Sequence, residues 1–238
     1  MKPLIILLLT TGTAFAQIPG PQYNPAAARA ARLFGKDYGF TANAHMSTKE
    51  SSDTETINEM DYAVRDGMVR IQMDLTKTET LRRGKPVRQR NDDTEGMASM
   101  GLNKQVILVR PDKQATYIVY PSLKAYSEAP KKASDAQSKS DWKEIGKDTV
   151  NGRPCIKYEV TTTNADGTTE VSTAWKATDL KDFVIQTADA TTTLTFKNVK
   201  LDKPDAKVFE LPADFKQYGS IQEMMMGAMQ QMMQNMGQ

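Results

Sequence analysis

The clearest pattern along the chain is an alternation of hydrophobic and polar positions with a period of two. It begins at Tyr38, extends to about Phe215 and is broken by short turn sequences such as Asp66-Gly67 and Asn151-Gly152. A period of two is typical of β-strands that bury one face, and Asp-Gly and Asn-Gly pairs favour tight hairpin turns. The pattern predicts about ten antiparallel strands joined by short turns, and therefore a mainly β fold.

The most regular part of this pattern is the stretch of residues 105–128. Two runs rich in β-branched and aromatic residues flank the turn sequence Pro111–Gln114, and Pro121-Ser122 separates the second run from a third. Such runs bounded by turn residues predict a three-stranded meander. The candidates for its buried face are Tyr117, Val119, Leu123 and Tyr126.

Residues 76–105 interrupt the alternation. Five basic residues crowd into this segment and are followed at once by acidic ones; they are Arg82, Arg83, Lys85, Arg88 and Arg90. The charge pattern predicts a solvated loop, with a basic patch for anionic lipid headgroups or a cell-wall polymer as the alternative. Residues 96–102 are predicted to form a helical turn that inserts Met97 and Met100 into the core.

Helices are expected only near the two ends of the chain. Asn24-Pro25 resembles a helix start, which predicts a helix over residues 26–34. Ser220 and Glu223 form a capping-box pattern that predicts a second helix in the last part of the chain. Its methionines at helical spacing predict a packed stripe or a movable lid, and they are Met225, Met229, Met232 and Met236.

The first 16 residues have the features of a secretory signal peptide: one lysine, a short apolar run and a small-residue cleavage site that ends at Ala16. The expected location is therefore periplasmic or secreted. The predicted organisation is a signal peptide (1–16), a linker and helix (17–37), a sheet domain (38–218) and a methionine-rich helix or tail (219–238). Residues 130–141 are predicted to be a polar linker, and no later stretch is apolar enough to span a membrane.

Composition and charge narrow the classes of function. The formal net charge of +2 argues against nucleic acid as the main partner. Cys155 is the only cysteine, so no internal disulfide can form, and its neighbours favour a small core residue. His45 is the only histidine and is predicted to be a surface strand residue. Without nucleophile-base pairs, metal-ligand clusters or phosphate loops, the sequence predicts neither an enzyme nor a resident metal or cofactor.

Five short motifs together resemble a known group of proteins. They are the Asp112-Lys113 turn, Pro121-x-x-Lys124-x-Tyr126, the hairpin from Lys147 to Tyr158, Trp175-x-Ala177-x-Asp179-Leu180, and Phe209-x-x-Pro212. In this order they resemble an uncharacterised family of exported bacterial proteins that is similar in fold to the periplasmic lipoprotein carrier LolA and its receptor LolB. The resemblance covers about residues 38–215.

This resemblance implies a curved antiparallel sheet that forms a half-open barrel around an apolar hollow, with helices near the two ends capping it. The residues expected on the concave, ligand-binding side are Phe40, Met73, Val109, Tyr117, Val119, Tyr158 and Phe196. Tyr38, Ile71, Ile107, Val160 and Leu194 are expected on the same side.

The function expected from these features is an exported binding protein that holds a lipid or another apolar ligand. Two alternatives remain open. The thioether sulfurs of the C-terminal segment could bind Cu(I), since soft metals prefer soft ligands. The chain could also be a non-catalytic envelope scaffold. The sequence does not indicate a protein partner.

Overall fold

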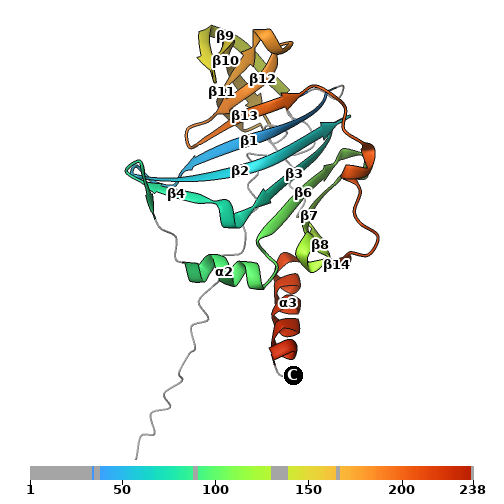
Figure 1. Ribbon diagram of the computed structural model, residues 1–238. Helices are drawn as coiled ribbons and strands as arrows, with labels where there is room; N and C mark the ends of the chain where they lie inside the picture. The colour runs from blue at the N-terminus through green and yellow to red at the C-terminus, as the bar shows by residue number, and fades with distance from the viewer. Residues whose placement is uncertain (1–33, 35–37, 88–90, 130–138, 165–166, 237–238) are drawn as a thin grey trace, which may run out of the picture.

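The computed structural model describes residue 34 and residues 38–87, 91–129, 139–164 and 167–236. Its dominant feature is one strongly curved, open sheet of fourteen strands (Figure 1). The strands are β1 (Gly39–Lys49), β2 (Thr54–Arg65), β3 (Met68–Asp74), β4 (Glu79–Arg82), β5 (Lys85–Val87), β6 (Lys104–Arg110), β7 (Ala115–Tyr120), β8 (Ala125–Glu128), β9 (Lys139–Val150), β10 (Arg153–Thr163), β11 (Thr169–Ala177), β12 (Phe183–Ala188), β13 (Thr192–Lys200) and β14 (Lys216–Tyr218). The two α-helices among the described residues are α2 (Asn91–Ser99) and α3 (Ile221–Met236).

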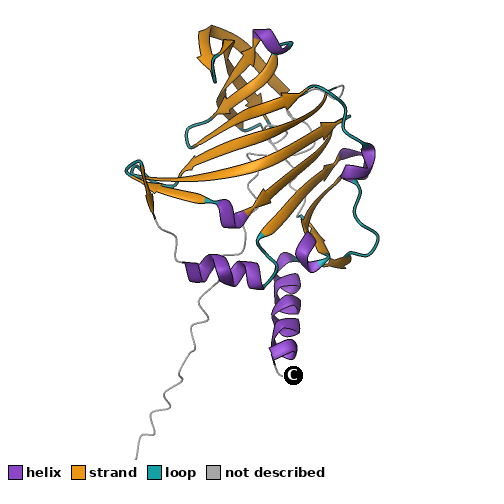
Figure 2. Ribbon diagram, viewed as in Figure 1, coloured by secondary structure: helices purple, strands orange, loops and turns teal. Residues whose placement is uncertain are grey.

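The strands follow the order β14-β8-β7-β6-β3-β2-β1-β13-β12-β11-β10-β9, and β4 and β5 extend from β2. Neighbouring strands are antiparallel except β14, which is parallel to β8. The path runs from β14 to β9 without closing, and Figure 2 shows how little helix accompanies it. The prediction of a mainly β, half-open barrel is confirmed.

The prediction of a solvated loop for the charged part of residues 76–105 is wrong, whereas the helical turn predicted over residues 96–102 overlaps the end of α2. The segment contains the hairpin β4–β5 and the helix α2, so the strand count rises above the expected ten. The reason is the length of β2. Its second half, Met60–Arg65, pairs with β3, while its first half, Thr54–Ile57, has a free edge that β4 occupies. Backbone pairing of this kind needs no hydrophobic alternation, so the sequence pattern does not reveal it.

An aromatic cluster forms the centre of the core on one face of the sheet, which we call the core face. The rings of Phe40 and Phe183 have centroids 4.9 Å apart, although β13 lies between their strands. Strands two positions apart are separated by roughly 9–10 Å in a flat sheet, so the sheet must curve inward on this side. Phe196 lies among these rings, and Phe34 stacks on Phe183 at 4.9 Å. The alternation predicted in β1 is confirmed, because Phe40, Ala42, Ala44 and Met46 are all buried.

A second cluster covers the core face of the meander. It contains Leu102, Ile118, Tyr120, Ala125, Ala129 and Met224. The Tyr120 hydroxyl is buried and accepts a hydrogen bond of 3.0 Å from Nε2 of Gln105. The first turns of α3 contact this cluster through Ile221, Met224 and Met225, and the rest of the helix projects away from the sheet (Figure 1).

Several predicted segments lie outside the described residues. They are the signal peptide (1–16), the linker and N-terminal helix apart from Phe34, and residues 130–138 of the polar linker. Residue 139 already belongs to β9, which is longer than the strand expected from residue 142. Neither described helix is both long and apolar enough to cross a membrane.

We expect Phe196→Ala to lower the free energy of unfolding by about 3–5 kcal/mol, because it removes a fully buried ring and leaves a cavity among three other phenylalanines. Urea denaturation followed by circular dichroism measures the change. Val171→Ala, at a largely exposed position of β11, is the matched control and should stay within about 0.5 kcal/mol of the parent. A loss below about 1 kcal/mol for Phe196→Ala would contradict the central role of the cluster.

We also expect stability to fall between about pH 10 and 12 because of Tyr120. Burial raises the pKa of Tyr120 to about 12 from an ordinary 10, against a smaller opposite effect of the Gln105 hydrogen bond. The folded state therefore keeps a proton that the unfolded state has lost, and stability decreases as pH rises through this window, by roughly 2–3 kcal/mol in total. Urea denaturation at several pH values measures the slope. Tyr120→Phe should lack this part of the slope, and equal slopes for the two proteins would contradict the assignment.

Candidate functional site

A large cavity lies on the other face of the sheet, which we call the outer face. Its volume is about 1170 Å³, and it opens to solvent. Strands β1, β2, β3, β6, β7 and β13 form its floor, and the segment between β13 and β14 covers it. We call residues 201–215 the strap. The strap residues that line the cavity are Pro204, Val208, Glu210, Pro212 and Phe215.

Pairing between strands divides the cavity floor into a polar half and an apolar half. Residues that pair directly across neighbouring strands share a face, so the register gives two rows of outer-face side chains. The first row runs Lys200, Thr41, Ala63, Arg70, Leu108, Tyr117. The second row runs Asn43, Asp61, Gln72, Val106, Val119. Apart from Ala63, the residues of both rows are polar as far as β3, and from β6 onward the rows consist of apolar and aromatic residues.

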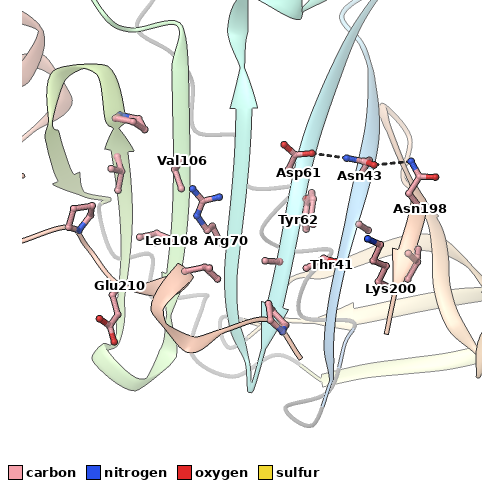
Figure 3. Close-up of a pocket in the computed structure, with 18 of the residues that line it drawn as sticks. Thr41, Asn43, Asp61, Tyr62, Arg70, Val106, Leu108, Asn198, Lys200 and Glu210 are labelled. Carbon is pink, nitrogen blue, oxygen red and sulfur yellow. Dashed lines mark hydrogen bonds between the residues drawn. The ribbon is translucent and has the colours of Figure 1, made fainter. Parts of the chain in front are cut away.

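Three polar side chains are connected at the β13 side of the cavity. Asn198 donates from Nδ2 to Oδ1 of Asn43 at 2.9 Å, and Asn43 donates from Nδ2 to Oδ1 of Asp61 at 2.7 Å (Figure 3). Asn198 has a φ of +52° and lies at an irregularity in the pairing of β1 and β13. Asparagine tolerates this left-handed conformation better than most residues. The irregularity thus places an amide in the cavity wall.

Arg70 lies at the boundary between the two halves of the floor. Its direct neighbours across the strands are Ala63 and Leu108, and its Nη2 donates to Oε1 of Gln72 at 2.9 Å. Burial lowers the pKa of Arg70, and the negative charge of Asp61 partly offsets this effect. An arginine remains charged at neutral pH even so. The cavity therefore contains a half-buried cation beside an apolar wall.

The start of the strap is fastened to the turn between β2 and β3. Nη1 of Arg65 donates to the carbonyl oxygen of Pro204 at 2.8 Å, and Nζ of Lys203 lies 2.7 Å from Oδ1 of Asp66. The hydrogen bond from Lys203 lowers the pKa of Asp66. Gly39 permits this close approach, because a Cβ at that position would lie 2.9 Å from the Cα of Lys203.

The end of the strap is fastened to the meander. Nη1 of Arg110 donates to the carbonyl oxygen of Phe209 at 2.7 Å, and Lys124 forms an exposed ion pair with Asp214 at 2.8 Å. Phe209 itself is fully buried. Leu211 and Phe215 pack on the outer face of β6 and β7, against Val106, Leu108 and Val119. The strap is therefore held at both ends and bridges the polar half of the floor.

The structure does not bring the seven predicted ligand-binding residues together. Phe40, Met73 and Phe196 are buried in the core, and Val109 and Tyr158 pack against it from partly exposed positions. Tyr117 and Val119 point to the outer face, and of the seven only Val119 lines the cavity.

The register across the turn at residues 111–114 explains this correction. Ile107 pairs with Ile118, whereas Val119 pairs with Val106. The predicted grouping of Ile107 and Val109 with Tyr117 and Val119 is thus off by one residue. Such a slip moves every side chain of a strand to the other face.

The predicted methionine stripe occupies a real helix, but the packed methionine is a different one. Met224 is 1% exposed, whereas Met229 is 51% exposed and Met226 is 60% exposed. Met225 is partly buried, and the side chains of Met232 and Met236 lie outside the described part of the structure. The suggestion of a lid formed by the four predicted methionines stays a prediction.

The remaining candidate residues lie away from the cavity. His45 is a surface strand residue as expected, and its Nδ1 lies 2.8 Å from Oε1 of Glu59. Cys155 is buried, and burial raises the pKa of its thiol, which favours the unreactive protonated form. Within the described residues, no group of three or more His, Cys, Asp or Glu side chains could hold a metal ion.

Sequence reasoning missed the polar residues of this site, Asn43, Asp61, Arg70 and Asn198. They occupy the polar positions of the alternation, which the pattern assigns to solvent. One signal was available in the run from Val106 to Val109, which is apolar at four consecutive positions. A continuous apolar run predicts a strand that is covered on both faces. Something therefore had to cover the outer face of β6, and that element is the strap.

A comparison with solved structures finds several proteins whose structures resemble this chain at low sequence identity. The chain is similar to a LolA superfamily protein from Nitrosomonas europaea, at 8% identity over 77% of this chain and 94% of that chain, with a TM-score of 0.35. A domain provisionally named for outer membrane lipoprotein sorting, from Vibrio parahaemolyticus, matches at 12% identity over 78% and 94% of the chains, with a TM-score of 0.36. A DUF1329 family protein from Desulfovibrio piger matches at 12% identity over 78% and 95%, with a TM-score of 0.32. The chain thus resembles members of the LolA group, as the sequence motifs indicate.

No protein of curated function matches the chain. One protein family does match, over residues 40–193, which is 154 of the 238 residues and extends from β1 into β13. The chain therefore belongs to the family described as domain of unknown function DUF4412.

Proposed function

We propose that this chain is an exported, non-catalytic binding protein that holds a lipid or another ligand with a large apolar part in the cavity beneath the strap. The single observation that carries the proposal is the cavity itself, with its volume of about 1170 Å³ and its divided floor. Cavities that bind small molecules usually measure about 300–1,000 Å³ and combine apolar walls with a few polar groups. The space beneath the strap is slightly larger than this range, and its walls combine apolar side chains with a few polar groups.

The strap offers apolar surface that a ligand would cover. Val208 is 41% exposed and lines the cavity, and Pro212 and Phe215 line it further along. Covering apolar surface is favourable by roughly 25 cal/mol per Å². A ligand with an apolar chain would therefore gain affinity from the strap as well as from β6 and β7.

The lining residues support binding more than catalysis. Among the described residues, those that line the cavity include neither histidine nor cysteine. Of its two carboxylates, Glu210 lies on the strap, and Asp61 accepts a hydrogen bond from Asn43. Export is proposed from the predicted signal peptide alone.

We expect Ala63→Trp to weaken binding of the uncharged dye Nile red at least about tenfold, which corresponds to about 1.4 kcal/mol. Ala63 lies in the cavity floor between Thr41 and Arg70, so a tryptophan there would project into the space that the ligand needs. Fluorescence titration of the dye measures the change. Native mass spectrometry of freshly purified protein should also show bound lipid in the parent and less in Ala63→Trp.

The matched control is Val171→Trp, which adds the same side chain at a position of β11 that is 59% exposed. It should leave dye affinity unchanged. If Ala63→Trp binds the dye as tightly as the parent, the dye occupies another surface, such as the exposed methionines of α3, and the proposal fails. Absence of both dye binding and bound lipid in the parent protein would also overturn it.

A further inference from the structure

The one cation on the β3 part of the cavity floor is only partly satisfied by the protein. Arg70 makes a single hydrogen bond, from Nη2 to the neutral amide of Gln72. Within the described residues its Nε and Nη1 have no hydrogen-bond acceptor, and the guanidinium forms no ion pair. A guanidinium has five N–H donors arranged in a planar fork, so most of its donors remain available to a ligand.

The negative charge of Asp61, which acts on Arg70, does not complete this site. Asp61 influences Arg70 through space, but its Oδ1 is engaged by Asn43 at 2.7 Å. Asp61 is exposed, whereas Arg70 is half-buried, and burial lowers the pKa of Arg70 because it disfavours the charged form. A bound anion would relieve this cost, and a charge-assisted pair of hydrogen bonds to a carboxylate or phosphate matches the guanidinium geometry.

The side chains around Arg70 indicate how such a ligand would be oriented in the cavity. Leu108 lies directly beside Arg70 on β6, and Val106 lies on the same strand (Figure 3). Val119, which pairs with Val106, continues the apolar surface onto β7. Phe215 of the strap packs over this surface. On the other side, Ala63 and Thr41 are small and lead toward Lys200, the second cation of the lining. The floor of the cavity thus has its two cations on β13 and β3 and apolar side chains on β6 and β7, while the strap adds the carboxylate of Glu210.

We propose that the cavity selects amphiphiles with an anionic head, a carboxylate or a phosphate, which binds Arg70 while the apolar chain lies along β6 and β7 beneath the strap. This inference rests on the proposed function and adds the chemical class of the ligand. It also assigns Arg70 as the residue that sets the preference for a charged head.

The test compares two competitors that have the same chain and different heads. Dodecanoate and dodecan-1-ol are each titrated into complexes of Nile red with the parent protein, with Arg70→Met and with Arg70→Lys, and displacement of the dye is measured. We expect dodecanoate to displace the dye at least about tenfold more effectively than the alcohol from the parent. Arg70→Met should lose this preference, so that dodecanoate and dodecan-1-ol displace the dye from this variant equally well. Arg70→Lys should keep part of it, because the charge remains but the planar fork is lost.

Arg82→Met is the matched control. Arg82 is 68% exposed on β4 and pairs with Asp53 outside the cavity, so its removal changes net charge by the same amount. The preference for dodecanoate should survive this change. Circular dichroism and thermal unfolding establish that each variant is folded before titration.

Small anions and a competitor with a phosphate head distinguish a site for anionic amphiphiles from a site for free anions. Dodecyl phosphate should also displace the dye better than the alcohol, whereas acetate and inorganic phosphate at millimolar concentration should not displace it. Displacement by the small anions alone would show a site for free anions and overturn the proposal. If dodecanoate and dodecan-1-ol displace the dye equally well from the parent protein, the role of Arg70 is overturned and the proposed function remains intact. If neither long-chain competitor displaces the dye, the proposed function fails and the inference fails with it.

Discussion

The hydrophobic run in β6 is the constraint on which the rest of the structure depends. Val106, Ile107 and Leu108 are all nearly fully buried although successive side chains of a strand point to opposite faces. Both faces of the sheet must therefore be covered at this strand. The aromatic core and the cluster around Met224 cover one face, and Leu211 and Phe215 of the strap cover the other. The strap is thus a direct consequence of a strand that cannot expose either side to water.

The cavity follows from where the strap has to begin and end. It leaves β13 on one side of β1 and β2 and reaches β14 beyond β8, so it must cross the polar outer face of β1, β2 and β3 on the way. Polar floor side chains need water or a polar partner, so the strap cannot pack on them as it packs on β6. It is held instead through two of its backbone carbonyls, those of Pro204 and Phe209, which accept bonds from Arg65 and Arg110. A bridge fastened in this way leaves space beneath it.

Strands with one buried face were predicted well from the sequence. The buried positions of β1 are the expected ones, and the turns at residues 66–67 and 151–152 occur where the glycine pairs indicated them. The prediction failed where alternation carries no information. β6 and β7 are apolar on both faces, so nothing in their sequence distinguishes the core face of Ile118 from the outer face of Val119. The short strand β4 is specified by a free edge of β2, which is a property of the assembled sheet.

The position of α3 shows which segment covers the cavity. Met224 anchors α3 beside Ile118 and Tyr120 on the core face, whereas the cavity lies beside Val119 on the outer face. One strand, β7, thus separates the start of α3 from the cavity, and the helix projects away from the sheet beyond its first turns (Figure 1). The methionine spacing indicated a mobile cover because methionine adapts to varied apolar partners. In the structure the cover is the strap, whose polar contacts hold its start through Arg65 and Asp66, its middle through Arg110, and its end through Lys124. Val208 lies between the contacts at Pro204 and Phe209 and is 41% exposed, so its side chain is available to contact a ligand.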